Sequence, residues 1–185
     1  MNIDTKSKPS FKSHYPCALK IEPILKDELD RLEEIKIIGK IASSKWAAPT
    51  FTEPKKDGRI RILTDFRELN KNIQRSKHPL PNIQDILNRR SNYQFFTKLD
   101  ISMQYYCFNL DKESQQYCVM STPFGLYKYL KATMGVSQSP DFAQSVMDEL
   151  IIEFRKCVET FLDDVGIFTQ TWSEHIHILS KVLTI

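Results

Sequence analysis

The residues best suited to chemistry stand near the C-terminal end, in the sequence Phe161-Leu162-Asp163-Asp164. Short apolar, β-branched and aromatic runs flank them, and this pattern predicts a β-hairpin with the two aspartates at its tip. Two carboxylates held that close repel each other and are most easily kept ionised by a bound cation. Their oxygens suit Mg²⁺, with phosphate oxygens completing the shell. The pair therefore indicates phosphoryl-transfer chemistry, although a solvated Asp-Asp turn is the commoner explanation when such a dipeptide stands alone.

A third carboxylate, Asp100, ends the apolar run of residues 95–99. An aspartate at the end of a strand can simply cap the following turn. If this strand lies beside the 158–168 hairpin, however, Asp100 converges with Asp163 and Asp164. Three carboxylates on adjacent strand ends can hold two Mg²⁺ ions about 3.5–4 Å apart. Such a site activates an attacking 3′-hydroxyl and steadies a leaving pyrophosphate.

The composition is that of a soluble globular protein. Of the 185 residues, 41% are hydrophobic and 26% are charged, which allows one domain or two small subdomains that share a core. No apolar run is long enough to span a membrane, and residues 1–15 lack the apolar stretch of a secretory signal. We therefore expect an intracellular, cytoplasmic protein with no membrane partner. The four cysteines are scattered without a Cys-x-x-Cys pair, so a zinc site is not expected.

The net charge of +3 is unevenly distributed along the chain. Residues 51–100 hold 11 Lys or Arg against 6 Asp or Glu, whereas residues 101–185 hold 6 against 10. A basic middle followed by an acidic C-terminal part suits a polyanion track beside a metal site. Solvated surfaces produce similar asymmetry, so charge alone does not decide the function.

The elements that must position these residues follow from hydrophobic periodicity. Residues 1–16 show none and are expected to form a loose arm. The helix that starts at residues 139–141 is expected to bury Phe142, Val146, Leu150 and Phe154. Mixed helices and mostly antiparallel strands predict an α+β fold. The expected helices are 22–36, 82–89, the one from 139 and 172–183, and the expected strands are the hairpin 50–64, 95–100, 105–110, 117–121 and the hairpin 158–168.

Several segments, taken in order from about residue 22 to the end, resemble reverse transcriptases of long-terminal-repeat retrotransposons of the gypsy class. The resemblance implies an α+β polymerase palm, with an antiparallel sheet and helices on one face, joined to fingers. The segments that carry it are Ser44-Lys45-Trp46-Ala47-Ala48-Pro49, Lys55-Lys56-Asp57-Gly58, Arg61 through Lys71, Leu99-Asp100 followed by Tyr105, Thr122-Pro123-Phe124-Gly125, Met134-Gly135 through Ser139-Pro140, and Phe161-Leu162-Asp163-Asp164.

The resemblance also implies a division of the chain. Residues 1–21 would form an N-terminal arm, residues 22–94 the fingers with the start of the palm, and residues 95–185 the palm with the catalytic aspartates. The thumb and the RNase H domain of the family are expected to be absent.

Residue roles carry over through the matching motifs. Asp100, Asp163 and Asp164 would be the catalytic metal ligands, and the backbone carbonyl of Ile101 would also reach a metal. The cofactor would be two Mg²⁺ ions, with Mn²⁺ as the alternative.

Basic residues of the 50–64 hairpin would hold the nucleotide. Lys55 or Lys56, together with Arg61, would clamp the triphosphate, because Arg suits bidentate phosphate contacts and Lys acts as a point charge. A solvated hairpin is the alternative for these cations.

Two further residues would shape the nucleotide pocket. Tyr105 resembles the steric gate that excludes a 2′-hydroxyl, and a core aromatic is its alternative. Gly135 would let the backbone approach the nucleotide, and an ordinary turn glycine is its alternative.

The resemblance implies an RNA-directed DNA polymerase that adds deoxynucleotides to the 3′-end of a primer, as part of a retrotransposon polyprotein. Its partners would be an RNA or DNA template with primer and deoxynucleoside triphosphates, within a cytoplasmic retroelement particle. Three departures from the family pattern are Phe161 for Tyr, Gln104 for a small Gly, and Ala132-Thr133 for Leu-Pro. They support the alternative of a truncated, weakly active or inactive remnant that at most binds nucleic acid. The oligomeric state is left open.

Overall fold

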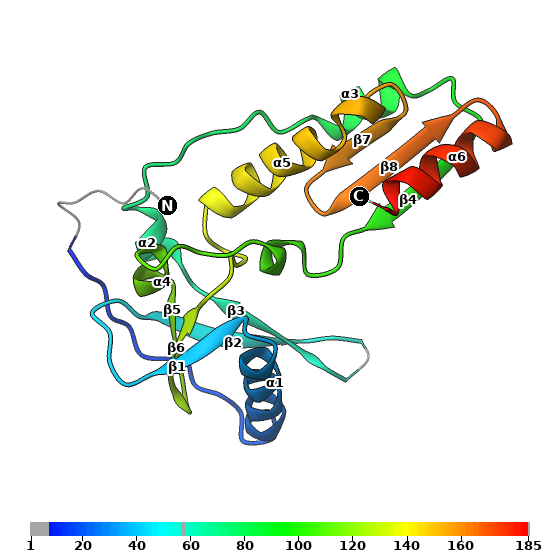
Figure 1. Ribbon diagram of the computed structural model, residues 1–185. Coiled ribbons are helices and arrows are strands. Elements are labelled where there is room, and N and C mark those ends of the chain that lie inside the picture. Colours follow the sequence, from blue (N-terminus) through cyan, green and yellow to red (C-terminus); the bar gives the residue numbers. More distant parts are fainter. Residues whose placement is uncertain (1–7, 57, 185) are drawn as a thin grey trace. The chain divides into compact units, whose positions relative to one another are not determined.

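The computed structural model describes residues 8–56 and 58–184 (Figure 1). The chain forms two compact units whose segments alternate along the sequence. Unit 1 comprises residues 1–75 and 105–139, and unit 2 comprises residues 76–104 and 140–185. Residues 76–94 belong to unit 2 and residues 105–139 to unit 1, so the two units are not continuous in sequence. The division into an arm at 1–21, fingers at 22–94 and a palm at 95–185 stays a prediction.

Unit 1 is a five-stranded sheet with helices packed on it. Its elements are α1 (Glu22–Glu34), β1 (Ile38–Ile41), β2 (Ala48–Pro54), β3 (Ile60–Thr64), α2 (Arg67–Asn70), α4 (Ser114–Tyr117), β5 (Val119–Thr122) and β6 (Gly125–Tyr129). The strand order is β1-β6-β5-β2-β3, and only the β2–β5 pair is parallel. Figure 1 shows α1 beside this sheet. Its Leu25, Leu29 and Leu32 share one helix face because of their spacing, and they are buried in the core of the unit.

Unit 2 is a three-stranded antiparallel sheet in which β8 (Asp164–Thr169) lies between β4 (Phe95–Asp100) and β7 (Val158–Phe161). One face carries the core, where Val158, Val165 and Ile167 are buried against side chains from two helices, including Met147 and Leu179. These helices are α5 (Gln138–Leu150) and α6 (Trp172–Val182), and Figure 1 shows both beside the sheet. The elements are α3 (Ile83–Arg89), β4 (Phe95–Asp100), α5 (Gln138–Leu150), the 3₁₀ helix η2 (Ile152–Phe154), β7 (Val158–Phe161), β8 (Asp164–Thr169) and α6 (Trp172–Val182).

The predicted α+β class is confirmed, and so are most of the elements. The expected helices 22–36, 82–89 and 172–183 are α1, α3 and α6, and the expected hairpins 50–64 and 158–168 are β2–β3 and β7–β8. The expected strand 117–121 is β5, shifted by up to two residues. No helix within residues 8–56 and 58–184 is both long and apolar enough to cross a membrane.

The strand expected over residues 105–110 is wrong. Gln104–Cys107 form a short 3₁₀ helix, η1, and only Asn109 makes an isolated β-bridge, to Lys131. The preceding residue, Met103, has a positive φ of 58°, which turns the chain out of the extended conformation that β4 has until Asp100.

The buried face expected for α5 is also wrong. Phe142 and Leu150 are 48% and 45% exposed, whereas Ala143 and Gln144 are completely buried. The prediction followed the apolar residues, but the helix turns a glutamine inward. Hydrophobic periodicity cannot find a face on which a polar side chain is buried with hydrogen-bond partners.

The N-terminal segment is not a loose arm in its described part. Phe11 forms a parallel bridge with Ala47, where Lys12 N–H donates to Ala47 O at 2.9 Å and Ala47 N–H donates to Ser10 O at 3.0 Å. These contacts extend the β2 region by one short paired segment. Residues 1–7 of the expected arm lie outside the described residues.

Candidate active site

The register of unit 2 brings two of the three expected aspartates together. Asp100, the last residue of β4, lies directly opposite Asp164, the first residue of β8. Directly opposed residues of an antiparallel pair point to the same face, with Cβ atoms about 4.5–5.5 Å apart. The exposure of β4 alternates, and Phe96, Lys98 and Asp100 are its exposed positions. The two carboxylates therefore lie on the face of the sheet opposite the core.

Asp163 belongs to the two-residue turn between β7 and β8. Its backbone carbonyl accepts a 2.7 Å hydrogen bond from Ile101 N–H, which ties the end of β4 to this turn. The turn is left-handed at Leu162, where φ is 53°. A left-handed conformation of a residue other than glycine costs about 1–3 kcal/mol and persists only where surrounding contacts impose it. The predicted metal contact of the Ile101 carbonyl stays a prediction.

Three hydrogen bonds of the buried residue Gln144 connect the turn to the core side of the unit. Leu162 N–H donates to Gln144 Oε1 at 3.0 Å, and Gln144 Nε2 donates to Asp148 Oδ1 at 2.9 Å and to Thr160 Oγ1 at 2.9 Å. Asp148 Oδ2 lies 2.8 Å from His78 Nε2. Burial by itself would raise the pKa of Asp148, but the hydrogen bonds from His78, Gln144 and Thr160 together lower it. A network of polar side chains therefore fixes the inner side of the turn.

A second glutamine holds the other backbone group of Leu162. Gln104 Nε2 donates to Leu162 O at 3.1 Å, and only 3% of this residue is exposed. Sequence reasoning noted Gln104 as a departure from the family pattern and assigned it no contact. The sequence analysis did not identify Gln144. Its position on α5, directly after the buried Ala143, was the only indication that this glutamine faces the core.

Lys98 lies on the same face as the carboxylates. Its Nζ is 2.8 Å from Asp164 Oδ2, and both side chains are accessible to solvent. The hydrogen bond to Asp164 raises the pKa of Lys98, and the charges of Asp164, Asp100 and Asp163 raise it further. The negative charge of the three carboxylates thus attracts cations, and the ammonium of Lys98 is the cation that pairs with Asp164. Sequence reasoning did not single out this residue.

The donor chemistry fits a hard divalent cation, since Asp100, Asp163 and Asp164 offer carboxylate oxygens at neighbouring backbone positions. Within residues 8–56 and 58–184, no three His, Cys, Asp or Glu side chains are yet arranged as a metal-binding group. Because Lys98 is bound to Asp164, a metal would have to displace an ammonium from one of its ligands. The predicted metal ligation by these aspartates stays a prediction.

The basic residues expected at the nucleotide lie in unit 1. Lys55 and Lys56 are exposed at the β2–β3 turn, where Lys55 N–H donates to Arg59 O at 2.8 Å. Arg61 is exposed on β3, opposite Glu53. Asp57 of this turn lies outside the described residues. Exposure leaves these side chains accessible to a phosphate, and their role toward a nucleotide stays a prediction.

Gly135 has a structural reason to be glycine. Its φ is 87°, and a Cβ there would lie 3.1 Å from Thr64 O. Asn70 binds the same segment, because its Nδ2 donates to Gly135 O at 2.7 Å and its Oδ1 accepts from Ser137 N–H at 2.9 Å. Tyr105 is half-buried in η1. The nucleotide roles expected for Gly135 and Tyr105 stay predictions.

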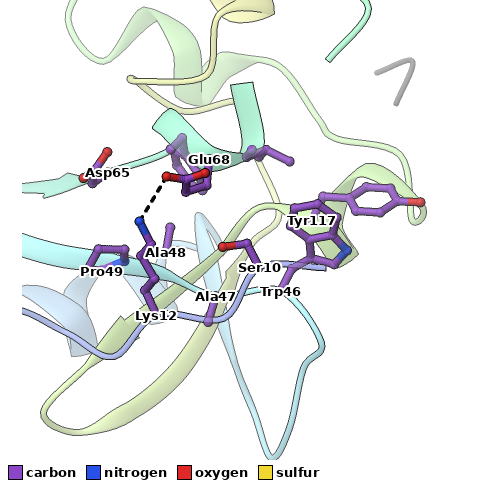
Figure 2. A pocket seen from close by; sticks show the side chains of 11 residues that line it. Ser10, Lys12, Trp46, Ala47, Ala48, Pro49, Asp65, Glu68 and Tyr117 are labelled. Carbon is purple, nitrogen blue, oxygen red and sulfur yellow. Dashed lines mark hydrogen bonds and ion pairs between the residues drawn. The ribbon is translucent and has the colours of Figure 1, made fainter. Parts of the chain in front are cut away.

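The Asp65–Lys71 segment builds unit 1 rather than presenting free charges. Arg67 Nη2 and Nε donate to Asp65 at 2.6 and 2.8 Å, and Tyr15 Oη donates to it at 3.0 Å. These bonds, that with Arg67 foremost, hold the pKa of the Asp65 carboxyl well below its usual range. Figure 2 shows Lys12 reaching Glu68, at 3.1 Å, beside a cavity of about 10 Å³. That volume holds about one water molecule and no nucleotide.

A family model for reverse transcriptase (RNA-dependent DNA polymerase) matches residues 53–185, which is more than half of the chain. This chain belongs to the reverse transcriptase family. Among its relatives, the uncharacterized protein K02A2.6 of Caenorhabditis elegans is 33% identical over 177 residues, which cover 94% of this chain and 14% of that protein. The retrovirus-related Pol polyprotein from transposon 297 of Drosophila melanogaster is 27% identical, over 97% of this chain and 18% of the polyprotein.

Solved structures of reverse transcriptases share the fold. The prototype foamy virus protease-reverse transcriptase matches with a TM-score of 0.89 and 24% identity, over 99% of this chain and 24% of that one. The foamy viral enzyme in complex with an RNA/DNA hybrid matches with a TM-score of 0.84 and 22% identity, over 99% of this chain and 25% of that one. This reverse transcriptase chain therefore spans between about a seventh and a quarter of the length of these relatives.

Proposed function

We propose that this reverse transcriptase chain adds deoxynucleotides to the 3′-end of a primer, and that Asp100, Asp163 and Asp164 form the catalytic site. The observation that supports the proposal is the register of β4 and β8, which sets Asp100 opposite Asp164 beside the turn that holds Asp163. Two divalent ions bound there would lower the pKa of the primer hydroxyl and neutralise charge on the triphosphate. The carboxylates themselves hold negative charge at one end of a rigid sheet.

We propose that the nucleic acid partner is a template with a primer, as in the foamy viral enzyme solved with an RNA/DNA hybrid. Lys55, Lys56 and Arg61 are the proposed triphosphate contacts, supported by their exposure on the β2–β3 hairpin. We keep Tyr105 as the proposed sugar-selecting residue. Arg61→Ala is expected to raise the KM for the deoxynucleotide, because a bidentate phosphate contact is lost. Arg89→Ala on α3, which removes an exposed arginine that pairs with Glu159 at 3.2 Å, is the control and should leave the KM unchanged.

The test is single-nucleotide primer extension with Mg²⁺. Asp163→Asn keeps the shape of the side chain and removes its charge, so incorporation should fall at least about a hundredfold. Asp85→Asn, at an exposed position of α3, is the matched control and should leave incorporation unchanged. Equal incorporation by the wild-type protein and Asp163→Asn would show that the site assignment is wrong.

A second candidate is nucleic-acid binding without polymerisation. The observation that favours it is the ion pair between Lys98 and Asp164, which occupies a ligand oxygen of the proposed site. Under this hypothesis the wild-type chain binds a primer–template in gel-shift assays, yet neither Mg²⁺ nor Mn²⁺ supports incorporation. Measurable metal-dependent incorporation by the wild-type chain excludes it.

A further inference from the structure

Both backbone polar groups of Leu162 are bound by buried glutamine side chains. Gln144 Oε1 accepts from its N–H at 3.0 Å, and Gln104 Nε2 donates to its carbonyl at 3.1 Å. The two glutamines come from different elements, α5 and η1, and are 0% and 3% exposed. Leu162 is therefore gripped from both sides at the residue that immediately precedes Asp163.

The Gln104 side chain is satisfied on one side only. Among the described residues, its Oε1 is buried and has no hydrogen-bond partner. The amide cannot be reversed, because Oε1 would then face the Leu162 carbonyl oxygen. A buried acceptor without a partner lowers stability, so the contact to Leu162 is retained at a cost to the fold.

Backbone strain points to the same place. Within the described residues, three residues other than glycine have positive φ, namely Lys36, Met103 and Leu162. Met103 immediately precedes Gln104, and Leu162 is the residue that Gln104 binds. Strained residues that cluster beside candidate catalytic groups suggest geometry imposed for function. The intrinsic backbone preferences of methionine and leucine would give both residues a negative φ.

We propose that Gln104 is a positioning residue, which holds Leu162 in its left-handed conformation so that Asp163 and Asp164 present their carboxylates to a divalent cation. This inference rests on the proposed function of the three aspartates. We call Gln104 and Gln144 together the clamp, because Gln104 binds the carbonyl of Leu162 and Gln144 binds its N–H. Gln104 touches neither carboxylate in this arrangement and acts on them through the backbone of the turn.

The experiment compares the wild-type chain with Gln104→Met, which keeps the length of the side chain and removes its donor. Gln84→Met, at an exposed position of α3, is the matched control. The first readout is amide hydrogen exchange at Leu162 and Asp163, measured by NMR without metal. The second is Mn²⁺ affinity, measured by electron paramagnetic resonance without nucleic acid. Thermal unfolding of each variant is recorded in parallel.

For Gln104→Met, we expect exchange at Leu162 to be at least about tenfold faster and Mn²⁺ affinity to be about tenfold weaker, as for outer partners of metal ligands. The unfolding midpoint should stay nearly unchanged, because removal of the buried unpaired Oε1 offsets the lost hydrogen bond to the carbonyl of the half-buried Leu162. If Gln104 had a purely structural role, the unfolding midpoint would fall, and amide exchange would become faster throughout unit 2 rather than at the turn alone. The control should match the wild type in all three measurements.

The inference is overturned if exchange at Leu162 in Gln104→Met equals that of the wild type. It is also overturned if Mn²⁺ affinity is unchanged while the wild type binds the ion. If the wild type binds no Mn²⁺ and incorporates no nucleotide, the proposed function fails, and the exchange rates still decide whether the clamp holds the turn. Should Gln104→Met fold poorly, Gln104→Leu replaces it in the same measurements.

Discussion

His175 braces the two strands that carry Asp100 and Asp164, from the core side of the sheet. It projects from α6 and is only 2% exposed. Its Nε2 lies 2.7 Å from Thr97 Oγ1 on β4, and its Nδ1 lies 2.8 Å from Thr169 Oγ1 on β8. One imidazole thus joins a helix to both strands of the candidate site.

We predict that His175→Phe lowers the free energy of unfolding by about 2 kcal/mol. The ring volume is kept, so the loss comes from hydrogen bonding. Thr169 is completely buried, and without His175 its hydroxyl keeps only the long 3.4 Å hydrogen bond to Thr171 O. A buried polar group whose hydrogen bonding is lost costs about 1–3 kcal/mol. Thr97 is only half-buried and can turn to solvent, so it adds a smaller amount. His175→Ala also opens a cavity and should cost about 3–4 kcal/mol.

The assay is urea unfolding followed by circular dichroism. His177→Phe, on the exposed side of α6, is the matched control and should change the free energy by less than about 0.5 kcal/mol. Combining His175→Phe with Thr97→Val and Thr169→Val removes the two hydroxyls that lose their hydrogen bond to His175, and it should restore most of the loss. If His175→Phe is as stable as the wild type, or if the triple variant is the least stable, the brace is misinterpreted.

Three further predictions follow from single contacts. Asp65 has a lowered pKa, so its bonds stabilise the fold above its unfolded pKa of about 4 and are lost as the pH falls below that value. Asp65→Asn should therefore cost about 1 kcal/mol at pH 7, with the difference from wild type shrinking below pH ~4 in urea titrations. Gly135→Ala should cost about 2 kcal/mol in the same assay, because its φ of 87° is unfavourable for alanine and its Cβ would press on Thr64 O at 3.1 Å; an unchanged midpoint contradicts this. Lys98→Met removes the ammonium from Asp164 and should tighten Mn²⁺ binding about fivefold in electron paramagnetic resonance titrations, whereas weaker binding would mean that Lys98 supports the site.

Local patterns in the sequence were enough to predict the hairpin tip. The apolar, β-branched and aromatic runs on both sides of Asp163 and Asp164 predicted β7 and β8, because strand preference and turn chemistry agree there. The end of β4 at Asp100 was also predicted correctly from the sequence. The sequence could not predict that β4 and β8 are neighbours, because no local signal states which strands pair. The β4–β8 register of the structure shows this pairing.

Contacts between distant residues were beyond the sequence. Gln104 binds Leu162 across 58 positions, and Gln144 binds it across 18. Gln104 was noted only as a departure from the family pattern, and Gln144 was not noted. The burial of Gln144 is the reason why the predicted face of α5 is wrong. Nothing in the sequence indicated the partners of His175, because its two threonines come from other elements. Buried polar networks of this kind become visible only when the strands are placed.

The most direct test of the central claim is a crystal structure of this chain with Mn²⁺, using anomalous scattering to locate the ion. If Asp100, Asp163 and Asp164 form a divalent-metal site, an anomalous peak should lie about 2.1 Å from carboxylate oxygens of Asp100 and Asp163, with Lys98 withdrawn from Asp164. A peak elsewhere, or an intact Lys98–Asp164 ion pair at saturating Mn²⁺, would contradict the account.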